Sequence, residues 1–280
     1  MFNDFEFKKS FGQNFIHDNN IIDKIIKSSM IDKDTLVIEI GPGAGSLSSS
    51  LVANSKYSIL YEIDTRLKPI LENVLKEYNN YEIVFNDFLK EDVATKISRY
   101  DYKKLYVVAN LPYYITTPII SKLINDNILP DKIVIMVQKE VADRLSAKVG
   151  SRDYGSLTVM LNYYYDIKKL FDVSRNCFTP KPNVDSAVVG MDLKKDRLQV
   201  DNMKLFNNLI RDSFQFKRKN LRNNLKKYDL DKIDYVLKKH NFDLSCRAEN
   251  IPLDVFVEIC NYINKWDFLV FFLLKYFTFS

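Results

Sequence analysis

Five apolar runs that alternate with helical or polar segments constrain the fold of this chain most. The runs are TLVIEI (35–40), YSILYEID (57–64), YEIVFND (81–87), KLYVVAN (104–110) and KIVIMVQ (132–138). A continuous apolar run of this kind is typical of a strand buried on both faces of a parallel sheet. Helical spacing in 65–77, 117–127 and 139–147 separates several of the runs. The alternation predicts βαβ units and an α/β fold with a mostly parallel, doubly wound sheet.

The pattern changes after residue 147. The segment 147–156 has two glycines and mixed charge and predicts a mobile surface loop, and the apolar LTVMLNYYY that follows it predicts a helix. Two more strands, 166–173 and 185–193, are expected as an antiparallel pair at the sheet edge. From about residue 199 the segments are helical in period. We therefore predict a Rossmann-like domain over 1–198 and a small all-α domain over 199–280.

Composition narrows the class of protein only modestly. The chain has 41 Lys+Arg against 36 Asp+Glu, a formal charge of +5, so the placement of the charges matters more than their sum. The cysteines are far apart and only two histidines are present, which predicts inert thiols and no metal site. The first ten residues, MFNDFEFKKS, lack the features of a signal peptide, so we expect a cytoplasmic protein.

A glycine-rich turn follows the first apolar run directly. In EIGPGAG (39–45), the glycines at 41, 43 and 45 would let the backbone approach a ligand closely. Glu62 closes the second strand 21 residues beyond Gly41, where a carboxylate can accept both hydroxyls of a ribose. The two features together predict a nucleotide-type cofactor.

Two cofactors compete for this turn. A dinucleotide site typically has a third glycine at the position of Ser46, and it is missing here. The acidic Glu39 would suit the cationic sulfonium and ammonium of S-adenosylmethionine, so the segment favours the methyl donor over a dinucleotide. Asp87, at the end of the third strand, could accept a hydrogen bond from an adenine amine, or it could simply cap a helix.

The segment NLPYYITTP (110–118) lies at the carboxyl end of the fourth run, where doubly wound sheets bind ligands. An aromatic amine is a poor nucleophile because its lone pair is delocalised into the ring. The Asn110 side-chain oxygen and the Leu111 carbonyl, held by Pro112, could accept hydrogen bonds from the N–H groups of such an amine. Tyr113 could stack on the base that carries the amine. The alternative is a plain strand-to-helix turn, which Asn and Pro also favour.

Ten segments, in order from about residue 8 to residue 263, resemble the small-subunit rRNA adenine N6-dimethyltransferase family of class I methyltransferases. They are KKSFGQNFI, EIGPGAGSL, YEID, NDF, NLPYYITTPII, QKEVADRL, YGSLTV, FTPKPNVDSAVV, FKRKNLRNNL and RAENI. The resemblance implies transfer of four methyl groups in total to two adjacent adenosines in the 3′-terminal hairpin of small-subunit rRNA. It also implies S-adenosylmethionine as cofactor and a role in ribosome small-subunit biogenesis.

The resemblance also implies roles for individual residues. The residues that would line the cofactor site are Asn14, Ile16, Gly41, Gly43, Glu62, Asp87 and Asn110. Asn110 to Tyr113 would form the catalytic motif, and Phe178 would stack on the target adenine opposite Tyr113. We expect Tyr114 to pack in the core rather than to contact substrate.

A basic run predicts the RNA surface. Residues 213–227, SFQFKRKNLRNNLKK, hold six basic side chains and no acidic one, and a helix carrying them would contact phosphates. The residues that we expect to bind RNA are Lys217, Arg218, Lys219 and Arg222. Without the resemblance, a solvated charged face is the competing interpretation. Under the family arrangement, Lys8, Lys9, Lys148 and Arg152 would lie near the mouth of the cofactor site.

Two rival functions remain at this point. The large-subunit rRNA adenine methylases of the macrolide-resistance type typically have isoleucine in place of Leu111 and a different C-terminal domain. A ribosome-assembly or transcription factor that kept the fold as a nucleic-acid clamp is the second, and an intact Glu62, Asp87 and Asn110 disfavours it.

The tail KWDFLVFFLLKYFTFS (265–280) departs from the resemblance. It is very apolar but short and interrupted by Lys275, so we expect a helix packed on the C-terminal domain rather than a membrane span. A contact of this tail with a membrane surface or with a partner is the alternative.

For the chain as a whole, the immature small ribosomal subunit is the expected partner, and we expect a monomer.

Overall fold

The computed structural model describes residues 13–277, with side chains as far as residue 265. The chain divides into two compact units: unit 1 is Met1–Ala142 with Ile167–Leu193, and unit 2 is Asp143–Asp166 with Lys194–Ser280. This differs from the sequence-based division at 198/199, because residues 143–166 belong to unit 2. Tyr154 and Val159 explain the difference, since both are buried in the core that the C-terminal helices form.

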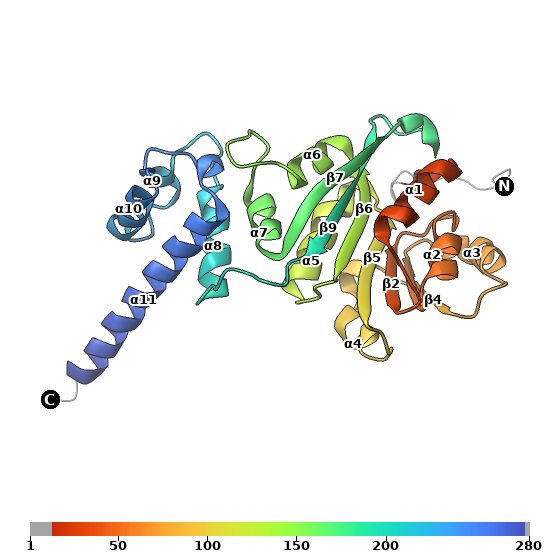
Figure 1. The fold of residues 1–280 in the computed structure, drawn as a ribbon, viewed down its shortest axis with the longest axis horizontal. Coiled ribbons are helices and arrows are strands. Elements are labelled where there is room, and N and C mark those ends of the chain that lie inside the picture. The colour runs from red at the N-terminus through yellow and green to blue at the C-terminus, as the bar shows by residue number, and fades with distance from the viewer. Residues whose placement is uncertain (1–12, 278–280) are drawn as a thin grey trace. The chain divides into compact units, whose positions relative to one another are not determined.

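Unit 1 is built on a seven-stranded sheet of order β4-β3-β2-β5-β6-β9-β7 (Figure 1). Its strands are β2 (Thr35–Ile40), β3 (Tyr57–Glu62), β4 (Tyr81–Phe85), β5 (Lys104–Asn110), β6 (Lys132–Gln138), β7 (Tyr165–Val173) and β9 (Ser186–Leu193). The five strands from β4 to β6 are parallel, and β9 pairs with β6 in the antiparallel sense. A mostly parallel sheet that ends in returning strands is thereby confirmed.

Short helices connect these strands. They are α1 (Asn19–Ser29), α2 (Ser48–Asn54), η2 (Thr65–Leu67), α3 (Lys68–Val74), η3 (Phe88–Lys90), α4 (Val93–Ile97), η4 (Tyr113–Ile115), α5 (Thr116–Asn125), α6 (Lys139–Leu145) and η5 (Arg175–Cys177). The apolar face of α1, with Ile21, Ile22 and Ile25, packs on the sheet beside Val108 and Val134. Burial of such a face, rather than helix propensity, provides most of the stability of a helix of this length.

A second, two-stranded sheet pairs β1 (Phe15–Ile16) with β8 (Phe178–Thr179) in the antiparallel sense. Phe15 lies opposite Thr179 and Ile16 opposite Phe178. The pairing fixes the segment that precedes α1 against the connection between β7 and β9. Two stretches about 160 residues apart in sequence therefore meet beside the main sheet.

The order of the strands reverses between β2 and β5, which places the expected ligand site at the carboxyl ends of these two strands. Every residue of β2 is buried, as its continuous apolar sequence predicts. One of them, Glu39, is a carboxylic acid with 1% of its surface exposed.

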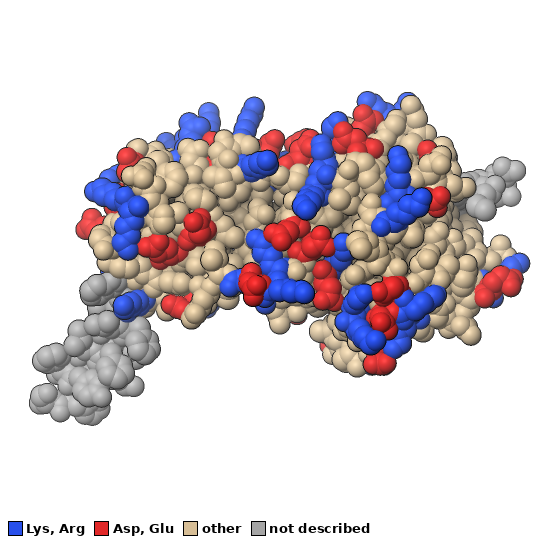
Figure 2. Space-filling view, viewed as in Figure 1, with Lys and Arg blue, Asp and Glu red and all other residues tan. Residues whose placement is uncertain are grey.

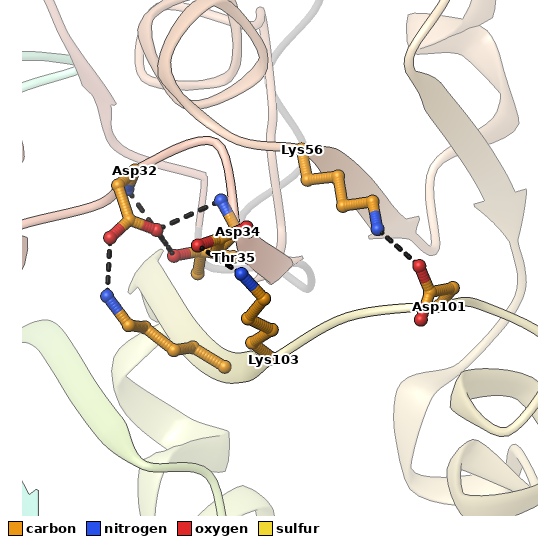
Figure 3. Close-up of polar contacts among 7 residues, drawn as sticks. Asp32, Asp34, Thr35, Lys56, Asp101 and Lys103 are labelled. Carbon is orange, nitrogen blue, oxygen red and sulfur yellow. Dashed lines mark hydrogen bonds and ion pairs between the residues drawn. The ribbon is translucent and has the colours of Figure 1, made fainter.

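Polar contacts tie β2 to β5 at the opposite end of the strands (Figure 3). Asp32 accepts hydrogen bonds from the Thr35 hydroxyl at 2.7 Å and the Asp34 N–H at 3.1 Å, and it forms an ion pair with Lys104. Lys103 pairs with Asp34 at 3.1 Å. Lys104 is the main cause that lowers the pKa of Asp32 to about 2. Since Thr35 lies opposite Lys104 in the ladder, these contacts support the register that aligns the two strands at the site.

Unit 2 is helical. Its helices are α7 (Ser156–Tyr164), α8 (Met203–Ser213), α9 (Leu221–Asn224), α10 (Leu230–Lys239), η6 (Ala248–Asn250) and α11 (Leu253–Phe277). The loop expected at 147–156 is present, but it is anchored within the unit, because the Gly150 N–H donates to the Glu249 carbonyl at 2.8 Å and Tyr154 is buried.

The apolar tail continues α11 as far as Phe277, while the packing of its side chains lies outside the described residues. No helix in the part of the chain that the structure covers combines the length and the apolar character needed to cross a membrane.

Candidate active site

The glycine turn after β2 has the backbone conformation that its sequence predicts. Gly41, Gly43 and Gly45 all have positive φ angles, of 72°, 60° and 82°. At Gly43 the positive φ already disfavours a side chain, and a Cβ built there would also lie 2.5 Å from the Phe15 ring. The N-terminal segment thus packs directly on the turn, and only glycine leaves room for it.

Glu62 ends β3 beside this turn and is 5% exposed. Its Oε2 accepts a hydrogen bond from the Gly43 N–H at 3.0 Å, and its Oε1 accepts one from the Asp64 N–H at 2.8 Å. Burial raises the pKa of Glu62, although these backbone hydrogen bonds oppose the shift. The backbone N–H groups of Gly43 and Asp64 therefore hold the Glu62 carboxylate in one orientation.

Glu39 lies deeper at the same end of the sheet. Burial raises its pKa to about 8, and the nearby charge of Glu62 adds to the effect. The Ser48 side chain opposes the shift, yet neither Ser48 Oγ nor Glu39 Oε2 forms a well-aligned hydrogen bond among the described residues. The Oε2 atom of Glu39 is therefore a buried oxygen without a hydrogen bond from the described residues, on a residue that lines the site.

Asp87 caps a helix, as one of its two interpretations predicts, and it also lies at the cavity where the other interpretation places it. Its side chain caps η3 by accepting a hydrogen bond from the Leu89 N–H at 3.0 Å, and the same residue lines the cavity. Ile63, directly after Glu62, also lines the cavity and is 45% exposed. Sequence reasoning missed Ile63, although its position directly after Glu62 at the end of β3 was a signal that could have found it.

Asn110 ends β5 and is oriented by the N-terminal segment. Its Nδ2 donates to the Asn14 carbonyl at 3.0 Å. This contact orients the amide, whose side-chain oxygen is the one atom of the group that can accept a hydrogen bond. Gln13 fixes the same segment from the other side by donating to Asp64 Oδ2 at 2.8 Å.

The residues after Asn110 form a tight turn. The Leu111 N–H donates to the Met136 carbonyl at 3.1 Å, and Pro112 packs on the glycine turn, 3.5 Å from a Cβ built at Gly41. The Tyr113 hydroxyl forms a 2.6 Å hydrogen bond with the buried Ser186 hydroxyl of β9. Burial is the main cause that raises the pKa of Tyr113.

These groups surround a cavity of about 230 Å³ in unit 1. The predicted residues that line it are Asn14, Ile16, Gly41, Gly43, Glu62, Asp87, Asn110, Leu111, Pro112 and Tyr113. Tyr114 lines it too and is 55% exposed, so the expectation that it packs in the core was wrong. Gln13, Phe15 and Asn86 are lining residues that sequence reasoning did not single out.

Phe178 is not among the residues that line this cavity. It is 3% exposed and lies in the core cluster with its ladder partner Ile16, which does line the cavity. The β1–β8 pairing therefore places Phe178 beside Ile16, buried and outside the lining of the cavity. Sequence alone could not reveal this burial, because it depends on a contact with β1.

The basic run lies in unit 2, but as a turn rather than as the expected helix. α8 ends at Ser213 and α9 begins at Leu221, so Lys217, Arg218 and Lys219 fall between the two helices. These three side chains and Arg222 are exposed. Lys148 and Arg152 also belong to unit 2, and Lys8 and Lys9 lie outside the described residues.

Comparison with known proteins decides the family. The model of the ribosomal RNA adenine dimethylase family matches residues 4–265. This chain belongs to that family. Two curated relatives, both called ribosomal RNA small subunit methyltransferase A, are each 42% identical to it. The match with the Clostridium acetobutylicum protein covers 93% of this chain and 95% of the relative, and that with the Listeria monocytogenes protein covers 95% and 92%.

Solved structures agree with this assignment to the dimethylase family. A dimethyladenosine transferase from Plasmodium falciparum superposes with a TM-score of 0.76 at 28% identity, covering 90% of this chain and 98% of the other. The 23S rRNA methyltransferase ErmE superposes with a TM-score of 0.68 at 24% identity, covering 90% and 100%. The second likeness shows the fold alone. The fold is therefore that of the class I methyltransferases, as the sequence predicted.

The residues present fit the cofactor of such an enzyme. S-adenosylmethionine would supply an activated methyl group next to a positive sulfonium. The turn at Gly41–Gly43 offers close backbone approach, Glu62 offers a fixed carboxylate, and Glu39 offers an unpaired buried oxygen. A cavity with acceptor oxygens and little positive charge suits a cation better than a pyrophosphate.

Proposed function

We propose that this chain transfers methyl groups from S-adenosylmethionine to the N6 atoms of two adjacent adenosines in the 3′-terminal hairpin of small-subunit rRNA. The observation that carries the proposal is the position of Asn110–Tyr113, which border one cavity with Glu62 and Asp87 at the strand-order reversal of a dimethylase-family fold. The substrate would be the immature small ribosomal subunit.

The geometry of the cavity supports a role for three residues in binding the cofactor. Glu62 would accept both ribose hydroxyls, because its carboxylate is already fixed by two backbone N–H groups. Asp87 would accept from the adenine amine with the oxygen that does not cap η3. Ile63 would cover one face of the adenine ring. These contacts bind and orient the cofactor without supplying a proton.

The catalytic roles concern the target amine. The Asn110 side-chain oxygen and the Leu111 carbonyl would accept hydrogen bonds from the two N–H groups of the target amine. The lone pair of the amine nitrogen would then be directed at the methyl carbon. Asn110 is suited to this task because its amide nitrogen is held by Asn14. Rate enhancement would come mainly from in-line positioning and from electrostatic stabilisation of charge that develops on the nitrogen.

The target base has to leave its helix, because an A-form duplex hides the reacting edge. Tyr113 would stack on one face of the flipped adenine, held by its hydrogen bond to Ser186. Phe178 is buried beside Ile16 and does not line the cavity, so its ring would have to move to reach the opposite face of the base. Binding of the base and movement of this ring are therefore coupled in the proposal.

The first experiment measures methyl transfer. Small subunits from an unmethylated strain are incubated with labelled methyl donor, and N6-dimethyladenosine is mapped in the rRNA. Asn110→Ala should abolish transfer while leaving subunit binding largely intact. Asn73→Ala, at an exposed residue of α3, is the matched control and should retain full activity. Full activity of Asn110→Ala would exclude the proposed role, and binding of the wild type without transfer would favour a non-catalytic assembly factor.

The second experiment tests the RNA surface. Replacement of Lys217, Arg218 and Lys219 by alanine should weaken binding and reduce the slope of log affinity against log salt by up to about 2. The control removes three lysines of unit 2 that contact carboxylates, by the changes Lys232→Ala, Lys238→Ala and Lys239→Ala. An equal fall in slope for both triple variants would mean that net charge, not this surface, drives binding.

A further inference from the structure

Phe216 is an apolar ring in a strongly basic, exposed turn. It is 56% exposed, and it immediately precedes Lys217, Arg218 and Lys219 in the connection from α8 to α9. Single exposed apolar side chains are common and need no explanation by themselves. The surroundings of this ring, however, differ from those of an ordinary surface residue in two respects.

The first respect is the rigidity of the backbone. Asn224 is buried, and its Nδ2 donates to the Ser213 carbonyl at 2.7 Å and the Phe216 carbonyl at 3.3 Å. Its Oδ1 accepts a hydrogen bond from the Phe216 N–H at 3.3 Å. The Lys219 N–H also donates to the Phe216 carbonyl, at 2.9 Å. Both peptide groups of Phe216 are therefore fixed, so the ring is presented to solvent from a pre-organised turn.

The second respect is the charge around the ring. Within the described part of the chain, the basic side chains at 217, 218, 219 and 222 have no carboxylate within ion-pair distance, whereas the flanking Arg211 and Lys227 contact Asp212 at 3.6 and 2.8 Å. On the face drawn in Figure 2, basic and acidic side chains are intermixed, which makes an uncompensated group of four cations more distinctive than the net charge.

We propose that Phe216 is a stacking platform for an unpaired base of the rRNA, with the four cations on the adjoining phosphates. The inference rests on the proposed function and adds a second base contact to it, in unit 2 and separate from the flipped adenosine. An aromatic ring beside basic side chains is the arrangement with which proteins bind single-stranded nucleic acid, because every base has a face that can stack. The lack of acidic residues in 213–227 favours a polyanion over a protein partner.

The test compares substitutions at this one position. Binding of the full-length protein to small subunits is measured at several salt concentrations. Phe216→Ala should weaken binding roughly 5- to 150-fold, the range for loss of one base stack. Phe216→Trp should keep the wild-type affinity, whereas Phe216→Leu should bind as weakly as Phe216→Ala. The salt slope should stay at the wild-type value in all three variants, because stacking releases no counterions, and this distinguishes them from the lysine and arginine variants.

Two further measurements complete the design. Tyr235→Ala removes a comparably exposed ring of α10, at 51% exposure, and should bind normally. Replacement of Phe216 by p-benzoylphenylalanine, followed by irradiation, should give an adduct on an rRNA nucleotide. Wild-type affinity of Phe216→Ala, recovery by Phe216→Leu, or an adduct on a ribosomal protein would each overturn the inference. Absence of methyl transfer by the wild type would instead refute the proposed function and leave the stacking measurements interpretable.

Discussion

Glu39 gives this protein a pH dependence of stability that can be calculated from its position. The side chain is 1% exposed in the centre of the parallel sheet, and its Oε2 accepts no hydrogen bond from the described residues. Burial raises its pKa from 4.5 to about 8. The substitution Glu39→Gln keeps the shape and removes the titration.

The sign and size follow from proton linkage. The folded state holds the proton more tightly than the unfolded state, so between pH 4.5 and pH 8 the folded state carries more protons. The free energy of unfolding therefore falls as pH rises through this window, by roughly 5 kcal/mol in total and by about 2.5 kcal/mol between pH 5.5 and pH 7.5.

Urea unfolding of the cofactor-free protein at pH 5.5 and pH 7.5 measures this effect. Wild type should lose about 2.5 kcal/mol more stability over the interval than Glu39→Gln, because the substitution removes this titration, and a Glu39 with a pKa of about 8 is mostly neutral over the interval and perturbs Glu62 little. Any constant effect of a buried amide cancels in the difference. Glu77→Gln, at an exposed site, should follow the wild type. Parallel pH profiles for wild type and Glu39→Gln would show that the carboxyl is solvated or paired, and would refute the reasoning.

Three other outcomes are expected. Gly43→Ala should cost at least about 1 kcal/mol more than Gly150→Ala in thermal unfolding, because both have positive φ but only Gly43 has a ring 2.5 Å from the added Cβ; equal costs would mean that Phe15 moves freely. Tyr113→Phe and Ser186→Ala should each lower kcat with little change in KM, and the double variant should be no worse than either; additive losses would separate the two hydroxyls. Asn224→Ala should destabilise by about 1–3 kcal/mol in urea and weaken subunit binding, and normal binding would show that the turn holds its shape unaided.

The sequence by itself determined the parallel strands of the sheet and many of the residues that line the cavity. Strands such as 35–40 are apolar at nearly every position, and this pattern is local, so it could be recognised without knowing any partner. The glycines at 41 and 43, Glu62 and the NLPY segment follow the ends of those strands directly. Because parallel strands bring their carboxyl ends to one edge, residues far apart in sequence could be assigned to one cavity.

Tertiary structure decided which groups are buried, oriented or free. The Asn110 amide is oriented by a carbonyl 96 residues away, and Phe178 is buried beside its ladder partner Ile16, outside the lining of the cavity. The start of the basic run forms a turn, which the hydrogen bonds of Asn224 close. Residues 143–166 belong to unit 2 because Tyr154 and Val159 are buried in the core of its helices. Periodicity and propensity act over a few residues, whereas burial and long-range hydrogen bonds depend on the whole fold, and for that reason a single sequence does not reveal them.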